Sequence, residues 1–65
     1  MSYAVGDRVK IKISLSPEVI KGSKGNVTGL LAGALCDVLF DEQPGGAPIN
    51  PPSAETVPEN NLDPG

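Results

Sequence analysis

Apolar and charged residues alternate with a period of two along residues 5–13, VGDRVKIKI. This alternation is typical of a half-buried strand, because successive side chains of a strand point to opposite faces of the sheet. We therefore predict a strand over residues 5–13. Its inward-facing residues would be Val9, Ile11 and Ile13. The opposite face would carry three cations, Arg8, Lys10 and Lys12.

Residues 14–24, SLSPEVIKGSK, begin with small polar residues and a proline, which predicts that the strand ends and a loop follows. Ser16 and Pro17 could begin a single helical turn that holds Val19 and Ile20 and ends at Gly22. Such a turn would bring two apolar side chains of an otherwise polar loop to the core.

Glycines mark the following segment, residues 21–31, KGSKGNVTGLL. The pattern predicts a turn that leads into a second strand through Val27 and Leu31. Gly25 would supply a tight turn, and Gly29 a bulge or kink of the kind that bends a small sheet round on itself.

The most apolar stretch, residues 31–43, LAGALCDVLFDEQ, permits two interpretations. Apolar residues in 30–38 also satisfy a helical spacing, but Gly33 interrupts it and no capping residue precedes the run. We favour a hairpin whose connection is residues 32–34. The strand that follows would turn Cys36, Val38 and Phe40 to the core, and Asp37, Leu39 and Asp41 to solvent.

Six of the seven prolines lie in residues 44–65, which excludes a regular central strand or a long helix there. We predict a Pro/Gly-rich loop over residues 44–55, then a short edge strand near Thr56 and Val57. A single helical turn in the sequence PENN would precede Leu62, which returns to close the sheet. Pro64 and Gly65 suggest a frayed terminus.

A chain of 65 residues buries one core at most, so residues 1–65 are expected to be a single domain. With one cysteine and no histidine, the sequence predicts no internal disulfide, no zinc site, no imidazole base and no cofactor. We expect Cys36 to be a buried core residue rather than a nucleophile, because Asp37 beside it is negative. Asp41 and Glu42 are interpreted as a solvated strand end.

No secretory signal is visible after Met1, and no run approaches the eighteen or more apolar residues that span a bilayer. The absence of disulfide-forming pairs fits a reducing compartment. We therefore expect a cytoplasmic protein that is not inserted in a membrane.

The charges are unevenly distributed along the chain. All five cations lie in the first 24 residues, where two carboxylates leave a net +3, whereas residues 25–65 carry six carboxylates and no cation, a net −6. Such asymmetry has two interpretations: a surface for a charged partner, or a fold that interleaves the two signs over one solvated surface. The candidate partner-binding residues are Arg8, Lys10, Lys12, Lys21 and Lys24.

Four motifs resemble the E-type subunit of photosystem I and related small SH3-like proteins of cyanobacteria: VGDRVKI (5–11), KGNVTGL (24–30), CDVLFDE (36–42) and VPENNL (57–62). The resemblance implies an all-β, five-stranded SH3-like barrel with long loops and a short helical turn before the last strand. It also implies an accessory subunit that helps an acidic electron carrier such as ferredoxin to dock. Arg8, Lys10 and Lys12 match the positions of the exposed cations on the opening strand.

Parts of the sequence are compatible with two other functions. The GDRVKI and KGxxG arrangement is similar to the KOW segments of ribosomal and transcription proteins, but a pI near 4.5 and only two aromatic residues argue against nucleic-acid binding. A subunit of an oligomeric enzyme is the third interpretation, and the sequence leaves the oligomeric state open. The leading hypothesis is a non-enzymatic adaptor that docks an acidic protein.

Overall fold

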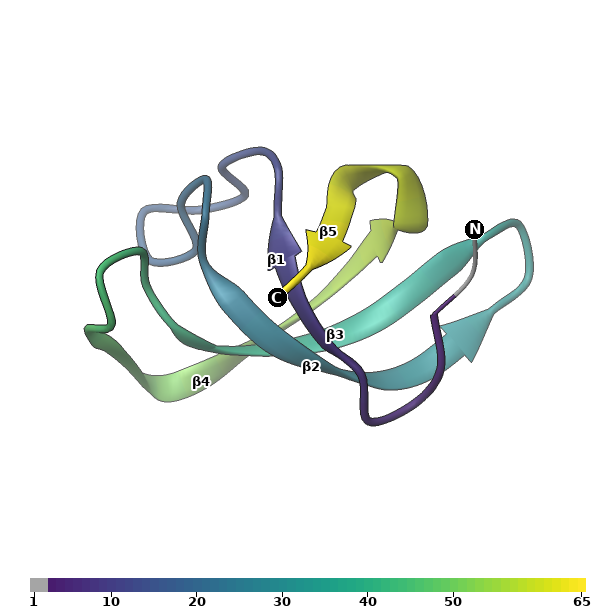
Figure 1. Cartoon of the computed structure of the whole chain (residues 1–65), viewed down its shortest axis with the longest axis horizontal. Helices are drawn as coiled ribbons and strands as arrows, with labels where there is room; N and C mark the ends of the chain where they lie inside the picture. Colours follow the sequence, from purple (N-terminus) through teal and green to yellow (C-terminus); the bar gives the residue numbers. More distant parts are fainter. Residues whose placement is uncertain (1–2) are drawn as a thin grey trace.

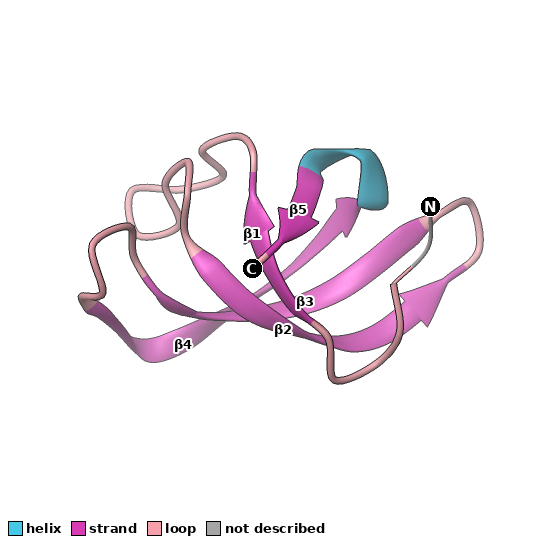
Figure 2. Ribbon diagram, in the orientation of Figure 1, coloured by secondary structure: helices cyan, strands magenta, loops and turns pink. Residues whose placement is uncertain are grey.

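The structure is a computed structural model that describes residues 3–65. It is all-β, as the alternating pattern predicts, and its single helical element is one 3-10 turn (Figure 2). The elements are β1 (Arg8–Ile11), β2 (Lys24–Leu31), β3 (Leu35–Glu42), β4 (Pro48–Pro58), the 3-10 turn η1 (Glu59–Asn61) and β5 (Leu62–Pro64).

The five strands form one antiparallel sheet in the order β4-β3-β2-β1-β5. β2 and β3 form a long twisted ribbon, and the short β1 and β5 cross above it, so the sheet curls into a half-barrel (Figure 1). No ladder joins β4 to β5, which leaves the half-barrel open between these two strands.

The core lies on the concave side of the curled sheet. It consists of ten buried apolar residues: Val9, Ile11, Val19, Val27, Cys36, Val38, Phe40, Ile49, Val57 and Leu62. β3 contributes three of them in strict alternation, and Phe40 is completely buried. The predicted hairpin is therefore confirmed, with residues 32–34 as its turn and Asp37, Leu39 and Asp41 on the other side.

β1 is shorter than predicted. Val9 and Ile11 are buried as expected, but the strand ends at Ile11, and Ile13 is 44% exposed. A turn in which Asp7 N–H donates to Ala4 O precedes the strand, so the extended segment cannot begin at residue 5. The prediction that Ile13 faces the core is wrong, because the chain leaves the sheet for the loop before it reaches this residue.

The loop after β1 is confirmed, but the helical turn predicted within it is wrong. Val19 O accepts hydrogen bonds from the N–H groups of Leu15 and Ser16, and Ser16 Oγ accepts one from Val19 N–H. These bonds satisfy the backbone of the loop without a helix, in the way that serine side chains commonly compete with helical hydrogen bonds. Val19 still reaches the core, whereas Ile20 is exposed.

The glycine positions are explained differently from the prediction. Gly22, with a φ of +93°, makes the turn that was assigned to Gly25. Gly25 lies in β2 against β3, where a Cβ atom would stand 2.8 Å from Phe40 Cα and clash with Leu39 O. The register of β2 against β3 shifts between Val27 and Gly29, which confirms the bulge predicted at Gly29.

The C-terminal third contains more strand than predicted. β4 begins at Pro48, so the loop predicted over residues 44–55 is only residues 43–47. Prolines are tolerated in β4 because it is an edge strand, where alternate N–H groups have no ladder partner.

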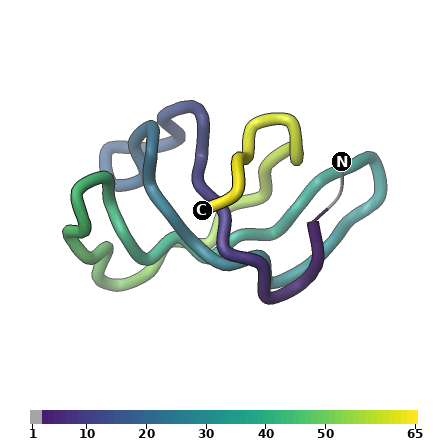
Figure 3. The backbone as a smooth tube through the Cα atoms, viewed as in Figure 1, coloured from purple at the N-terminus to yellow at the C-terminus, as the bar shows by residue number. Residues whose placement is uncertain are grey.

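The predicted helical turn in PENN is confirmed as η1, and Leu62 is buried and pairs with Ile11. The end of the chain lies beside β1 (Figure 3), where Gly65 N–H donates to Arg8 O at 2.9 Å. The prediction of a frayed terminus is therefore wrong.

Candidate functional site

The half-barrel brings four of the five predicted partner-binding cations together. Lys10 lies on the outer side of β1, and Lys24, the first residue of β2, is its direct partner across the two strands. Lys10, Lys12 and Lys21 line one shallow pocket together with Ile11, Gly22 and Asp63. We call these four residues the lysine patch: Lys10, Lys12, Lys21 and Lys24.

Lys10 and Lys24 form an opposed pair of like charges. Residues that face each other across antiparallel strands have Cβ atoms about 5 Å apart, and like charges at such positions are destabilising. Both side chains are half-buried, and within residues 3–65 neither forms an ion pair. The positive potential of this pair is thus not cancelled by a direct contact within the described chain.

Carboxylates flank the opposed lysines on the two neighbouring strands, β3 and β5. Glu42 is the partner of Lys24 on β3, and Asp63 is the partner of Lys10 on β5. Each of these carboxylates is bound by another cation, however: Glu42 by Arg8, and Asp63 by Lys12. Across the sheet, the order of these side chains is therefore Glu42, Lys24, Lys10 and Asp63. The two outer carboxylates form their ion pairs with Arg8 and Lys12, and not with the two central lysines.

Arg8 is separated from the lysine patch by its own contacts. Its guanidinium lies 2.9 Å from Asp41 Oδ1 and 2.9 Å from Glu42 Oε1, and it also donates to Asn26 Oδ1 at 3.1 Å. The side chain thus spans β2 to link β1 with β3. The prediction that Asp41 and Glu42 form a merely solvated strand end is therefore wrong, because both bind Arg8. These two carboxylates neutralise the charge of Arg8, so Arg8 is the least suited of the five predicted cations to bind a partner.

Lys12 has a weaker contact. Its Nζ lies 3.5 Å from Asp63 Oδ1, and both side chains are about half exposed. Exposed pairs of this kind contribute between about 0 and 1 kcal/mol, so Lys12 can exchange this carboxylate for one on a partner at little cost.

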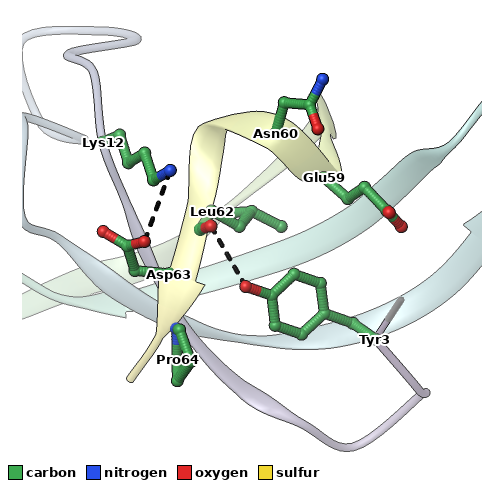
Figure 4. Close-up of a pocket in the computed structure, with 7 residues that line it drawn as sticks. All are labelled: Tyr3, Lys12, Glu59, Asn60, Leu62, Asp63 and Pro64. Carbon is green, nitrogen blue, oxygen red and sulfur yellow. Dashed lines mark hydrogen bonds and ion pairs between the residues drawn. The ribbon is translucent and has the colours of Figure 1, made fainter. Parts of the chain in front are cut away.

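A second pocket of about 390 Å³ lies over β5, where Tyr3 and Lys12 approach the strand from opposite sides (Figure 4). The Tyr3 hydroxyl donates to Leu62 O at 3.1 Å. Burial raises the pKa of the Tyr3 hydroxyl, and the nearby charge of Asp63 raises it further, so the hydroxyl keeps the proton that it donates. Sequence reasoning did not find Tyr3, because its position here depends on β5 pairing with β1.

Cys36 is confirmed as a core residue, with 1% of its surface exposed. Burial raises the pKa of its thiol, and the negative charges of Glu59 and Asp37 act in the same direction. A thiol with a raised pKa is mostly protonated near neutral pH and is a poor nucleophile. The structure therefore gives Cys36 a packing role.

The one helical element among the described residues is η1, a turn of three residues. Within residues 3–65 no helix has the length and apolar character needed to cross a membrane. No protein-family model, curated protein or solved structure matches this chain.

Proposed function

We propose that the chain is a non-enzymatic accessory subunit with an SH3-like fold, and that it docks an acidic protein partner through the lysine patch. Arg8 contributes at the margin of this surface, since its charge is shared with two carboxylates. The partner would bring carboxylates to the lysines that make no ion pair within the described chain.

One observation carries the proposal: Lys10 and Lys24 face each other across β1 and β2, and neither forms an ion pair within residues 3–65. A stable fold gains nothing from two opposed lysines, because their repulsion acts against the pairing of the two strands. Local conflicts of this kind are expected at functional sites, where a partner removes the cost. A carboxylate placed between the two ammonium groups would turn the repulsion into attraction.

The position of the lysine patch fits a docking surface. Lys12 and Lys21 are exposed, and with Lys10 they border an open pocket beside β5. The net charge of the chain is −3, so a positive surface is unexpected unless the fold gathers the cations. Charged patches of this kind steer association and raise its rate, and the effect weakens as salt screens the charges.

The SH3-like assignment within this proposal is supported by the order of the elements. β2, β3 and β4 form a meander, and the 3-10 turn η1 returns the chain so that β5 pairs with β1. This is the order that the four motifs imply through their resemblance to the E-type subunit of photosystem I and related proteins. We therefore take ferredoxin, an acidic electron carrier, as the partner to test first.

The test is a fluorescence-anisotropy titration of the labelled chain with ferredoxin at low ionic strength. We expect Lys10→Glu to weaken binding by roughly tenfold or more, which corresponds to about 1.4 kcal/mol. We also expect binding by the unmodified chain to weaken steeply when salt is raised, because the Debye length falls from about 30 Å at 0.01 M to about 10 Å at 0.1 M.

The matched control changes the net charge by the same amount elsewhere. Leu31→Glu combined with Ala32→Glu changes the net charge by −2 at the exposed end of β2 and the turn after it, and Lys10→Glu changes it by the same −2 in the lysine patch. If the control weakens binding as much as Lys10→Glu, the effect comes from total charge. That result, or an affinity that does not depend on salt, would contradict docking through the lysine patch.

A further inference from the structure

β4 has an unpaired outer edge. It is the first strand of the sheet order, and within residues 3–65 it pairs only with β3. Edge strands present a row of N–H and C=O groups that can pair with another chain, and proteins commonly protect such edges. The accessibility of the β4 edge therefore depends on which backbone groups point outward.

The register of the β3–β4 pair identifies these groups. Glu59 N–H donates to Ala34 O at 2.9 Å, so the backbone of Glu59, the residue after β4, faces β3. Backbone direction alternates along an antiparallel strand, and the pairing of residues 53–58 with β3 is regular. Ala54 and Thr56 are therefore residues whose N–H and C=O groups point away from the sheet. Both are exposed.

Prolines define the limits of this edge. Pro58 has the same outward orientation as Ala54 and Thr56 but has no N–H group to donate. Pro52, which precedes the regular pairing at the other end, has no N–H group either. Pairing with an added strand is therefore restricted to Ser53–Val57, five residues that span about 17 Å. This arrangement leaves one short window in which the N–H groups of Ala54 and Thr56 point away from β3.

The charges around the window favour a basic occupant. Glu55 lies within it on the same face as Val57. Asp37, the partner of Thr56 on β3, lies on the opposite face, where its Oδ1 accepts from Thr56 Oγ1 at 2.6 Å. Arg8 lies in the same cross-strand row as Ala54 but three strands away, about 14 Å across the sheet. Its guanidinium binds carboxylates on β3, so it does not neutralise Glu55 in the window.

A second copy of the chain would fit this edge poorly. Two β4 strands that pair across Ser53–Val57 would bring the carboxylate of Glu55 toward its equivalent, and no cation occurs in residues 25–65 to compensate. Like charges on directly paired strands are destabilising. A segment that carries lysine or arginine avoids this repulsion and gains contacts with the carboxylates beside the window.

We propose that the β4 edge, Ser53–Val57, is a docking site for an extended basic segment of a partner polypeptide, which adds to the sheet as a sixth strand. Main-chain hydrogen bonds to Ala54 and Thr56 provide the pairing, and the carboxylates of Glu55 and Asp37 select for positive side chains. This is the strand-addition mode of peptide recognition. The site is separate from the lysine patch and does not depend on it.

The test uses the full 65-residue chain labelled with ¹⁵N and a capped seven-residue peptide of lysine, valine and threonine, with lysines at both odd and even positions so that each face of the added strand carries one. We expect titration to shift the amide signals of residues 53–57 and to slow hydrogen exchange at Ala54 and Thr56. Ala54→Pro removes one outward donor and leaves the ladder to β3 intact, so we expect it to weaken binding by about tenfold. Ala54→Ser, which keeps the donor, should bind as the unmodified chain does.

If Ala54→Pro fails to fold, the proposal is tested by hydrogen exchange of the unmodified chain, measured with and without the peptide. The proposal is overturned if the peptide does not bind at millimolar concentration, or if Ala54 and Thr56 gain no protection in the complex. Equal binding of a peptide with glutamate in place of lysine would also overturn it. The mass of the protein in solution is a further readout. If it doubles as the concentration of the unmodified chain is raised but not for Ala54→Pro, a second copy is the occupant and the proposal is contradicted.

Discussion

Replacing Phe40 with alanine is expected to lower the free energy of unfolding by about 3–5 kcal/mol. Phe40 is completely buried in the middle of the core, so its loss leaves a cavity that this small sheet has little means to fill. A domain of this length has a total stability of only about 3–10 kcal/mol. We therefore expect Phe40→Ala to be largely unfolded, or close to it, at 25 °C.

Urea unfolding followed by far-UV circular dichroism measures this effect. The matched control is Leu39→Ala, since Leu39 is the preceding residue of β3 and points to the opposite, partly exposed side of the sheet. Its replacement is expected to cost less than about 1 kcal/mol. If the two variants lost similar stability, the assignment of the two faces of β3 would be wrong.

The second large effect is expected at Gly25, where alanine should lower the free energy of unfolding by about 3 kcal/mol. A Cβ atom at this position meets the backbone of Leu39 and Phe40 rather than a flexible side chain. The close contact between β2 and β3 would have to open to make room for it. A lowered midpoint in thermal unfolding is the expected result.

Gly29 in the same strand is the control for Gly25. A Cβ atom there would meet Asp37 Oδ2 at 3.3 Å, and this side-chain oxygen needs to shift by only a few tenths of an ångström. We expect Gly29→Ala to change stability by less than about 1 kcal/mol, because alanine also lowers the entropy of the unfolded chain. Equal losses in both variants would contradict the close approach of β2 and β3 at Gly25.

The sequence predicted the core of the fold where its alternation was strong. In β3, Cys36, Val38 and Phe40 alternate with charged or exposed residues over the whole strand, and the structure matches that pattern. The ends of β1 were mispredicted because Ile13 continues the apolar alternation after the chain has left the sheet. Periodicity reports which face a side chain would take, and it does not report where pairing with neighbouring strands stops.

The length of the strand in the C-terminal third was underestimated for a different reason. Its prolines correctly exclude a central strand, but they are compatible with a long edge strand, which needs N–H donors on one side only. The length of β4 depends on β3 being available beside it. That information is tertiary and is absent from the local sequence.

The sequence predicted which cations belong to the candidate site, but not which residues these cations contact in the fold. Strand alternation places Arg8 and Lys10 on the same face, and the structure agrees. The contact of Arg8 with Glu42 joins residues 34 positions apart, and the opposition of Lys10 and Lys24 depends on the β1–β2 register. Neither can be read from local pattern, yet together they decide which cations remain available to a partner.

The two proposed surfaces carry opposite charge and use different strands. The lysine patch involves β1, the start of β2 and the preceding loop, whereas the β4 edge lies on the other side of the β2–β3 ribbon in the strand order. An acidic partner and a basic segment could therefore be bound at the same time. A small subunit with both surfaces would connect two components of a larger assembly.

The measurement that tests the docking claim most directly is an ¹⁵N chemical-shift titration of the whole chain with ferredoxin at low ionic strength. We predict that the largest shifts fall on Lys10, Lys21 and Lys24 and that they vanish when salt is raised. Shifts confined to the β2–β3 turn or spread evenly over the chain would contradict the account. So would the absence of any shift at millimolar ferredoxin.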